Sequence, residues 1–223
     1  MVDSVSNARV FLLSPANCSG ERARLLMNPG ASFALARQLQ SSAGARLRDV
    51  FEFMSGLYFR GKLAYVDRFA RPPARGTGAL VITAGAGLLD LDQRVGPDDL
   101  RRFADVPIDP RDPRYREPLE RDARTLAKRL GAGGETVLLG SIATRKYSEI
   151  LLGIFTDRLC FPTAFVGRGD MSRGSLMLRS ARDGRELEYL PVPGEPVHAE
   201  KSGGPVRSNL APGSERIRGR RFQ

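Results

Sequence analysis

The sequence predicts an α/β fold in which a mixed β-sheet is flanked by helices and ends in a C-terminal β-hairpin. Short apolar runs, typical of buried strands, alternate with segments whose apolar residues recur every three or four positions, as in helices. The last third of the domain has the pattern of strands, and Asp183-Gly184 is typical of a hairpin turn. The 223 residues are enough for one domain with a buried core.

The first half of the chain begins with a strand and continues with helices. Residues 9–15 form an apolar run that Pro15 ends, which indicates a buried first strand. Asn28-Pro29-Gly30 breaks the helical pattern that follows, and Ser55-Gly56 breaks it again. The helices expected here cover residues 21–27, 32–41, 47–54 and 61–69.

The second half alternates strands and helices after a loop at residues 72–78. Residues 93–118 are rich in Asp and Pro and are expected to be irregular. The expected helices cover residues 119–130 and 143–155, and the expected strands cover 79–83, 136–142, 160–166, 175–180 and 186–190.

The chain is expected to form one domain over residues 1–192. Residues 193–223 have no apolar period and are dominated by Pro, Gly, Ser and charge, so they are expected to form a disordered basic tail. Two cysteines are too few for a disulfide framework, and no signal-peptide pattern precedes the first strand, which predicts a cytoplasmic protein. No apolar run approaches the roughly 18 residues of a membrane span, so no membrane partner is expected.

The charge of the chain favours anionic partners. It has 35 Lys and Arg against 25 Asp and Glu, a net charge of +10 and a pI near 10.4. Nucleic acid, a nucleotide or an acidic membrane surface would each suit this excess. Charge alone does not choose among them.

A glycine-spaced basic loop at residues 167–174 follows the apolar run 160–166 and is a candidate phosphate site. Glycine lets several backbone N–H groups point at one anion, and arginines add forked donors. The residues expected to act there are Arg168, Gly169, Ser172 and Arg173. The alternative is a hairpin turn with solvated arginines.

Loops beyond the carboxyl ends of strands are where open α/β sheets bind ligands. The loops at residues 14–21, 83–92, 140–146 and 167–174 are therefore expected to meet at one site. The polar candidates in the first and third of these loops are Ser14, Asn17 and Ser141. Such residues either cap a helix or contact a bound phosphate.

Other residues suggest further chemistry. Asp90 and Asp92, together with Asp98 and Asp99, could bind Mg²⁺ or supply a general base, although Asp is also a turn and cap residue. Cys18, beside an expected helix start, is either a thiol of lowered pKa that senses oxidant or a small buried residue. Lys62 lies among aromatic residues, a mixture that suits base stacking with phosphate contact or the core side of an amphipathic helix.

Several classes of site are not expected. The single histidine, His198, lies in the expected tail, which argues against a Ser/His/Asp or Cys/His triad. The sequence has no ligand cluster with zinc-site spacing, so neither a metal nor another cofactor is expected.

Three motifs, in order along the chain, resemble landmarks of the YaaA peroxide-stress family. They are Leu13-Ser14-Pro15-Ala16, Met54-Ser55-Gly56-Leu57 and Arg168-Gly169-Asp170-Met171-Ser172-Arg173. Residues 87–92, followed by Pro97 and Asp99, resemble the GLLDPD and PYD signature of related uncharacterised domains. The resemblance implies a compact YaaA-like α/β fold, a positively charged cleft, DNA binding, and protection of DNA during oxidative stress.

The chain departs from the family pattern at several basic positions. The lysine that usually follows the first motif is Asn17, and the lysines before the last motif are Phe165 and Val166. The tyrosine of the PYD signature is Asp98. These departures weaken the transfer of DNA binding from the family and leave open the alternative that the chain binds a small ligand.

The function expected from the sequence is therefore nucleic-acid binding, with DNA as the partner, through the basic cleft and tail. The alternative is an enzyme that acts on a nucleotide or nucleobase, with its phosphate at residues 167–174 and Asp90 or Asp92 as general base. A third reading is a basic interaction protein without a site, whose charge would be scattered.

Overall fold

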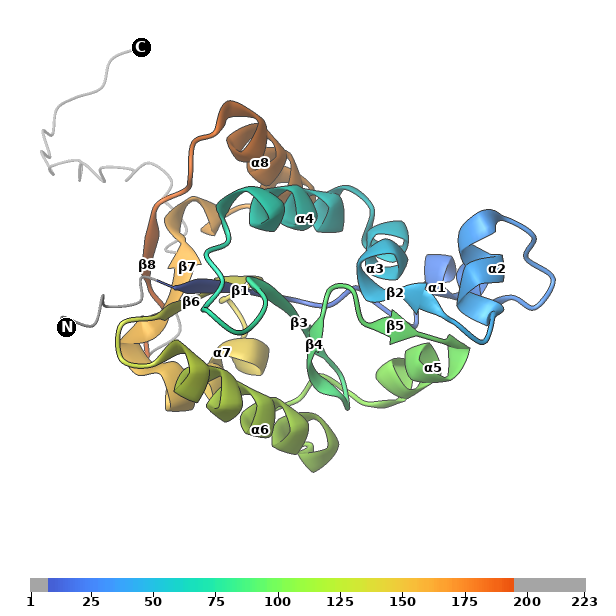
Figure 1. The fold of residues 1–223 in the computed structure, drawn as a ribbon, viewed down its shortest axis with the longest axis horizontal. Coiled ribbons are helices and arrows are strands. Elements are labelled where there is room, and N and C mark those ends of the chain that lie inside the picture. The colour runs from blue at the N-terminus through green and yellow to red at the C-terminus, as the bar shows by residue number, and fades with distance from the viewer. Residues whose placement is uncertain (1–7, 195–223) are drawn as a thin grey trace, which may run out of the picture.

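A computed structural model describes residues 8–194 and builds them around one six-stranded sheet (Figure 1). The strand order is β4-β3-β1-β6-β7-β8. The strands are β1 (Arg9–Leu13), β3 (Ala79–Thr83), β4 (Gly87–Asp90), β6 (Glu135–Leu139), β7 (Leu159–Pro162) and β8 (Tyr189–Pro191). The four inner strands run parallel, and β4 and β8 pair antiparallel to them at the two edges. A mixed sheet is thus confirmed.

Helices cover both faces of the sheet, so the central strand is buried on both sides (Figure 1). Phe11 and Leu13 face one core, and Val10 and Leu12 face the other. The helices of the first core are α1 (Glu21–Met27), α2 (Ala34–Gln40), α3 (Leu47–Ser55), α4 (Leu57–Phe69), α5 (Pro97–Asp105) and α8 (Asp170–Asp183). The helices of the second core are α6 (Pro113–Leu130) and α7 (Arg145–Phe155).

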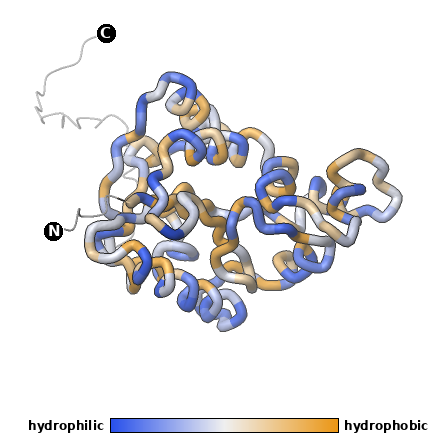
Figure 2. The backbone as a smooth tube through the Cα atoms, in the orientation of Figure 1, coloured by the Kyte–Doolittle hydropathy of each residue, from blue (hydrophilic) through white to orange (hydrophobic). Residues whose placement is uncertain are grey.

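Hydropathy follows this layering. Hydrophobic residues concentrate along the central strands, whereas α6 alternates between hydrophobic and hydrophilic residues along its turns (Figure 2). The buried residues of α6 recur every three or four positions: Tyr115, Leu119, Ala123, Leu126 and Leu130. One stripe of the helix therefore packs on the sheet, and its charged residues face outward.

Helices α4 and α8 approach each other closely because two glycines meet between them. A Cβ on Gly61 would lie 2.5 Å from the carbonyl oxygen of Gly174. A Cβ on Gly174 would lie 2.7 Å from the carbonyl oxygen of Leu57. A larger residue at either position would push the helices apart, so this contact determines how the side chains of α4 meet the start of α8.

The C-terminal hairpin differs from the prediction. Strands β7 and β8 do pair antiparallel, but residues 175–180, expected to be a strand, belong to α8. Asp183 ends that helix, and Gly184 is its left-handed cap at φ 65°. A glycine after Asp suits a helix end as well as a hairpin turn, which explains the error.

Residues 93–118 are also more regular than predicted. The N–H of Gly96 donates to the Asp99 carboxylate at 2.9 Å, and α5 begins at Pro97. The N–H of Arg114 donates to the Asp112 carboxylate at the start of α6. Pro97, Asp99, Asp112 and Pro113 mark helix starts, whereas Asp109 to Asp112 form a turn, in which the N–H of Asp112 donates to the carbonyl oxygen of Asp109 at 2.9 Å. A small two-stranded sheet joins β2 (Ala45–Arg46) to β5 (Arg94–Val95).

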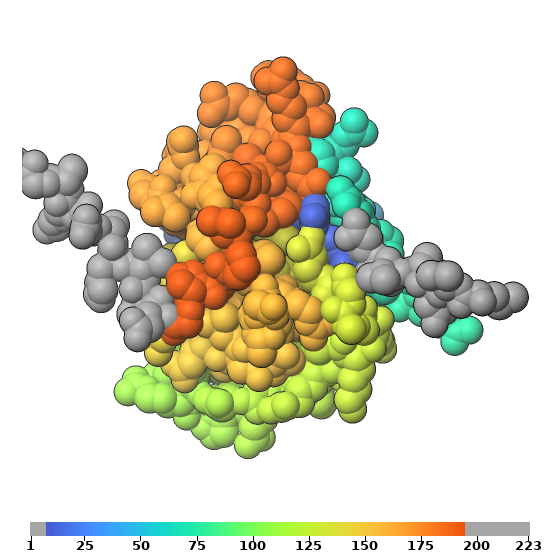
Figure 3. Space-filling view, turned by 90° about the vertical axis from the view of Figure 1, so that its left-hand side faces the viewer, coloured from blue at the N-terminus to red at the C-terminus, as the bar shows by residue number. Residues whose placement is uncertain are grey.

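The described chain ends beside the sheet. Figure 3 shows the segment that contains β8 running between α8 and the residues that follow α7. The N–H of Val192 donates to the carbonyl oxygen of Leu159 at 2.7 Å, so residues just beyond β8 still belong to the fold. Of the tail expected at residues 193–223, the part from 195 onward lies outside the described residues.

Candidate functional site

The site begins where two neighbouring parallel strands end. Leu13, the last residue of β1, pairs with Leu139, the last residue of β6. The next residue, Ser14, donates its N–H to the carbonyl oxygen of Leu139 at 3.3 Å. A Cβ on Gly140 would lie only 3.1 Å from the Ser14 Cβ, so a small residue after β6 leaves room for this serine. The two loops therefore start in contact.

A pocket of about 340 Å³ opens at this edge of the sheet. Its polar lining residues come from the loops after β1 and β6, from α3 and α4, and from the first turns of α7 and α8. They are Ser14, Asn17, Ser55, Tyr58, Ser141, Lys146, Tyr147 and Asp170. The predicted meeting of the loops 14–21, 140–146 and 167–174 is confirmed, since each contributes to this lining.

Lys62 lies behind the pocket wall and is bonded to Ser14. Its side chain is buried at 1 % exposure, and its Nζ donates to the Ser14 Oγ at 2.7 Å and to the Ser14 carbonyl oxygen at 2.8 Å. The ammonium also lies 4.0 Å from the centroid of the Tyr58 ring, within range of a cation–π contact. The core side of an amphipathic helix was one of the two roles predicted for Lys62.

Burial determines the protonation of Lys62. The pKa of its ammonium falls from 10.5 to about 7, chiefly because the side chain is removed from water and to a smaller extent because of the charge of Arg173. The carboxylate of Asp170 opposes this shift. At neutral pH a substantial fraction of Lys62 is therefore the uncharged amine, which can accept a proton.

Asp170 and Arg173 belong to the first turn of α8 and pair with each other at 3.6 Å. Arg173 is only 11 % exposed, and its guanidinium donates twice to the carbonyl oxygen of Phe165. Arg168 is exposed and donates to the Ser172 Oγ at 3.1 Å.

The predicted pair of arginines around one anion is therefore not formed. Arg173 directs its donors at the backbone before α8. Arg168, Gly169 and Ser172 do not line the pocket, and Gly169 is the N-cap of α8. The segment 167–174 is thus a loop and the start of a helix, and Asp170 is its contribution to the pocket.

The start of α7 supplies positive potential to the pocket. Its N-cap, Thr144, makes no side-chain hydrogen bond to the helix. Ser141 accepts from the N–H of Ala143 at 3.3 Å, before the helix begins, so it does not cap α7 either. Free N–H groups in a first helical turn carry partial positive charge, and Lys146 lies in that turn. An anion is therefore the ligand that this corner of the pocket suits.

The carboxylates predicted as general bases lie elsewhere. Strand β4 runs back along β3, so Asp90 pairs with Leu80, near the beginning of β3 and away from the edge where Ser14 lies. Asp90 accepts from the N–H of Asp92 at 2.8 Å, and Asp92 lies 3.6 Å from Arg46. They act as turn residues, the alternative role that the sequence allowed. Of the loop 83–92, Thr83 and Ala84 do reach the edge, where they line a second pocket.

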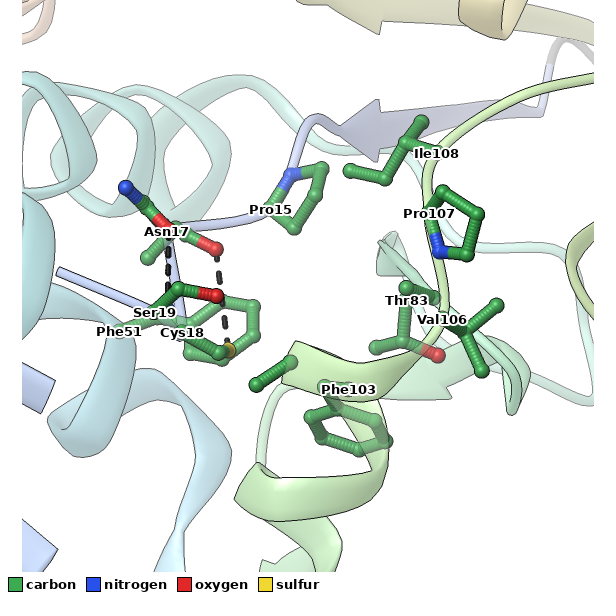
Figure 4. Close-up of a pocket in the computed structure, with 13 residues that line it drawn as sticks. Pro15, Asn17, Cys18, Ser19, Phe51, Thr83, Phe103, Val106, Pro107 and Ile108 are labelled. Atoms are coloured by element: carbon green, nitrogen blue, oxygen red, sulfur yellow. Dashed lines mark hydrogen bonds between the residues drawn. The ribbon is translucent and has the colours of Figure 1, made fainter.

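That second pocket, of about 220 Å³, lies on the other side of the loop 15–19 and is largely apolar (Figure 4). Cys18 lines it, and burial raises the pKa of its thiol to about 12. Of the two alternatives for Cys18, the structure supports the small buried residue over the thiol of lowered pKa, because the surroundings are apolar and α1 begins only at Glu21. Asn17 accepts from the N–H of Ser19 at 2.9 Å, which leaves its NH₂ group free to donate to a ligand (Figure 4).

Five polar residues of the lining were not among the site residues expected from the sequence: Ser55, Tyr58, Lys146, Tyr147 and Asp170. Lys146 is the last residue of the loop 140–146 that the sequence did single out, so its position was a usable signal. The sequence pattern could not distinguish Tyr147 from a core residue, because Tyr147 is one of the buried residues of α7. Asp170 lies in the segment 167–174, where the arginines and not the carboxylate were expected to act.

No family model, curated protein or solved structure matches the chain. Within residues 8–194, no group of three or more His, Cys, Asp or Glu side chains is placed to hold a metal ion. None of the helices in the same range is long and apolar enough to cross a membrane.

Proposed function

We propose that this chain binds nucleic acid in the cytoplasm, with DNA as its partner, and that the polar pocket receives one nucleotide of it. The observation that carries the proposal is the uncapped first turn of α7, with Lys146, facing a polar pocket of about 340 Å³. That volume lies within the range of small-molecule sites. The net charge of +10 supports an anionic partner.

Each wall of the pocket has a role in this proposal. The phosphate lies at the first turn of α7, where Lys146 and the helix N–H groups attract it. The free NH₂ group of Asn17 donates to an acceptor on the sugar or base. The resemblance to the YaaA family adds a role in protecting DNA during oxidative stress. Cys18 takes no part in that role, because its thiol stays protonated near neutral pH.

A second candidate function is an enzyme that acts on a nucleotide or nucleobase. The contact between Lys62 and Ser14 favours it, because binding alone does not need a buried amine of lowered pKa beside a hydroxyl.

The binding proposal is tested by fluorescence anisotropy with labelled single-stranded DNA, double-stranded DNA and free mononucleotides. Affinity for DNA should fall steeply between about 50 and 200 mM salt, because binding releases counterions. Lys146→Ala should weaken binding about 10-fold or more, the loss expected for a charged hydrogen bond.

Lys128→Ala is the matched control, since it removes the same charge from the exposed last turn of α6, at the opposite end of the sheet. It should change affinity less than about twofold. Equal effects of the two substitutions, or binding that is insensitive to salt, would contradict the proposal.

A further inference from the structure

Ser14 and Lys62 have the geometry of a nucleophile and its base. The Ser14 Oγ lies 2.7 Å from the Lys62 Nζ, which is a direct hydrogen bond. Ser14 lines the pocket, whereas Lys62 is buried behind it. The hydroxyl can therefore reach a bound ligand, whereas the amine lies behind it and contacts Ser14 rather than the pocket.

The second lysine contact holds this geometry. Lys62 also donates to the Ser14 carbonyl oxygen at 2.8 Å, so the backbone and the hydroxyl of one residue orient the same amine. Ser14 itself directly follows the buried strand β1, and a rigid strand end positions a reacting atom better than a free loop does.

We propose that Ser14 is a nucleophile, that Lys62 is its general base, and that the pocket cleaves a phosphoester of the nucleotide it binds. This inference rests on the proposed function for its substrate class. It differs from the sequence-based expectation of Asp90 or Asp92 as the base, since neither carboxylate reaches the pocket.

The reaction has two balanced steps. The neutral amine of Lys62 takes the hydroxyl proton of Ser14 as its Oγ attacks the phosphorus. The bond from phosphorus to the leaving oxygen breaks on the side opposite Oγ, and that oxygen takes a proton from solvent in the open pocket. Water then attacks the phosphoserine from that side and loses its proton to solvent, the Oγ–phosphorus bond breaks, and Lys62 returns its proton to Oγ. Lys146 and the first turn of α7 stabilise the negative charge on the phosphoryl oxygens.

Burial and two charged groups on α8 determine the proton affinity of Lys62. Asp170 and Arg173 face it from α8, with opposite effects, and burial exceeds both. Tyr58 lies beside it on α4, and Tyr147, on α7, lines the same pocket as Tyr58. Burial raises the pKa of both phenols, so they remain neutral where Lys62 titrates. The activity should therefore rise with pH through about 7 as the amine loses its proton.

The test is covalent labelling of the full chain by diisopropyl fluorophosphate, followed by peptide mass mapping. Attack by Ser14 breaks the P–F bond and releases fluoride, and leaves one diisopropylphosphoryl group on the Oγ. We expect one adduct on Ser14, formed faster as the pH rises from 6 to 8. Lys62→Met should slow labelling at least about 100-fold, the usual contribution of a general base. The rates at which p-nitrophenol is released from p-nitrophenyl phosphate, a monoester, and from bis(p-nitrophenyl) phosphate, a diester, then show which class of phosphoester the pocket cleaves.

Ser180→Ala is the matched control, because the exposed fraction of Ser180 is 7 %, close to the 6 % of Ser14, but Ser180 lies later in α8. It should label like the parent, and Ser14→Ala should not label. The pH dependence of the parent tests the base without any substitution, so a poorly folded Lys62 variant does not block the test. Absence of an adduct on folded parent protein, a rate independent of pH, or parent-like labelling of folded Lys62→Met would each overturn the inference.

DNA binding by Ser14→Ala separates this inference from the proposed function. If Ser14→Ala binds DNA and the parent is never labelled, the catalytic inference fails and the binding proposal stands. If the parent is labelled at Ser14 but binds neither DNA nor mononucleotides, the pair is catalytic and its nucleotide substrate is refuted.

Discussion

Lys62→Met should make the protein more stable at neutral pH, although it removes two hydrogen bonds. The parent must bury an amine whose pKa falls from 10.5 to about 7 on folding. That interval corresponds to about 5 kcal/mol between the charged and neutral forms. Methionine has a similar volume and no charge to bury. Each lost hydrogen bond to Ser14 costs about 1 kcal/mol, so the variant should gain about 2 kcal/mol at pH 7.

The gain should disappear as the pH rises. Between about pH 7 and 10.5 the unfolded chain keeps a proton on Lys62 that the folded chain has lost. The free energy of unfolding of the parent therefore rises with pH in this window, by about 1.4 kcal/mol per pH unit. The variant has no such contribution, so its advantage should shrink by about 2 kcal/mol between pH 7 and 9, because the slope at pH 7, near the pKa of the folded amine, is only half its full value.

Urea unfolding followed by circular dichroism at pH 7, 8 and 9 measures this difference. Subtracting the variant from the parent cancels the titration of all groups that the two proteins share. Lys128→Met is the control, since Lys128 is exposed and its substitution should give a difference that does not depend on pH. A parent-minus-variant difference that stays constant from pH 7 to 9 would refute the shifted pKa, and with it the availability of a neutral amine beside Ser14.

The remaining predictions concern the framework of the site and use the same unfolding assay. Gly61→Ala should destabilise by about 1–3 kcal/mol, because its Cβ would overlap the backbone of α8. Gly153 is a helical glycine with open space around it, so Gly153→Ala should instead stabilise the protein by about 0.5–1 kcal/mol. A loss of stability in both variants would contradict the packing argument. Arg173→Ala should lower the free energy of unfolding by about 1.5–3 kcal/mol, because the Arg173 guanidinium is only 11 % exposed and donates to backbone. Arg168→Ala should lower it by less than about 0.5 kcal/mol, because Arg168 is exposed. The reverse order would contradict the structural role assigned to Arg173. Thr156 has a φ of 55°, a strained conformation for a residue other than glycine, so Thr156→Gly should stabilise the protein by about 1 kcal/mol. A loss of stability would show that the hydrogen bonds of the Thr156 hydroxyl outweigh the backbone strain.

The sequence by itself determined the sheet and the edge at which the pocket lies. The strands β1, β3 and β6 are short apolar runs bounded by turn residues, which is how strands buried on both faces are recognised. Parallel strands end at the same edge, so the loops that carry Ser14 and Ser141 could be brought together without a structure. The excess of positive charge likewise comes from composition alone.

Only the tertiary structure decided what α8 is and which residues it brings to the pocket. Asp183-Gly184 suits a hairpin turn and a helix end equally, so local pattern could not separate the two. The direction of β4, which carries Asp90 away from the pocket, depends on its pairing with β3. Local sequence does not specify such a partner.

Lys62 shows the same division within the site. Its place among buried residues of an amphipathic helix was visible in the sequence, but its partner, Ser14, lies 48 positions away. The protonation of Lys62 depends on how completely α4, α8 and the end of β1 exclude water. The contact between Gly61 and Gly174 allows α4 and α8 to approach closely enough to do so. Burial of this kind is a property of packing between distant segments, which is why no reading of the local sequence could supply it.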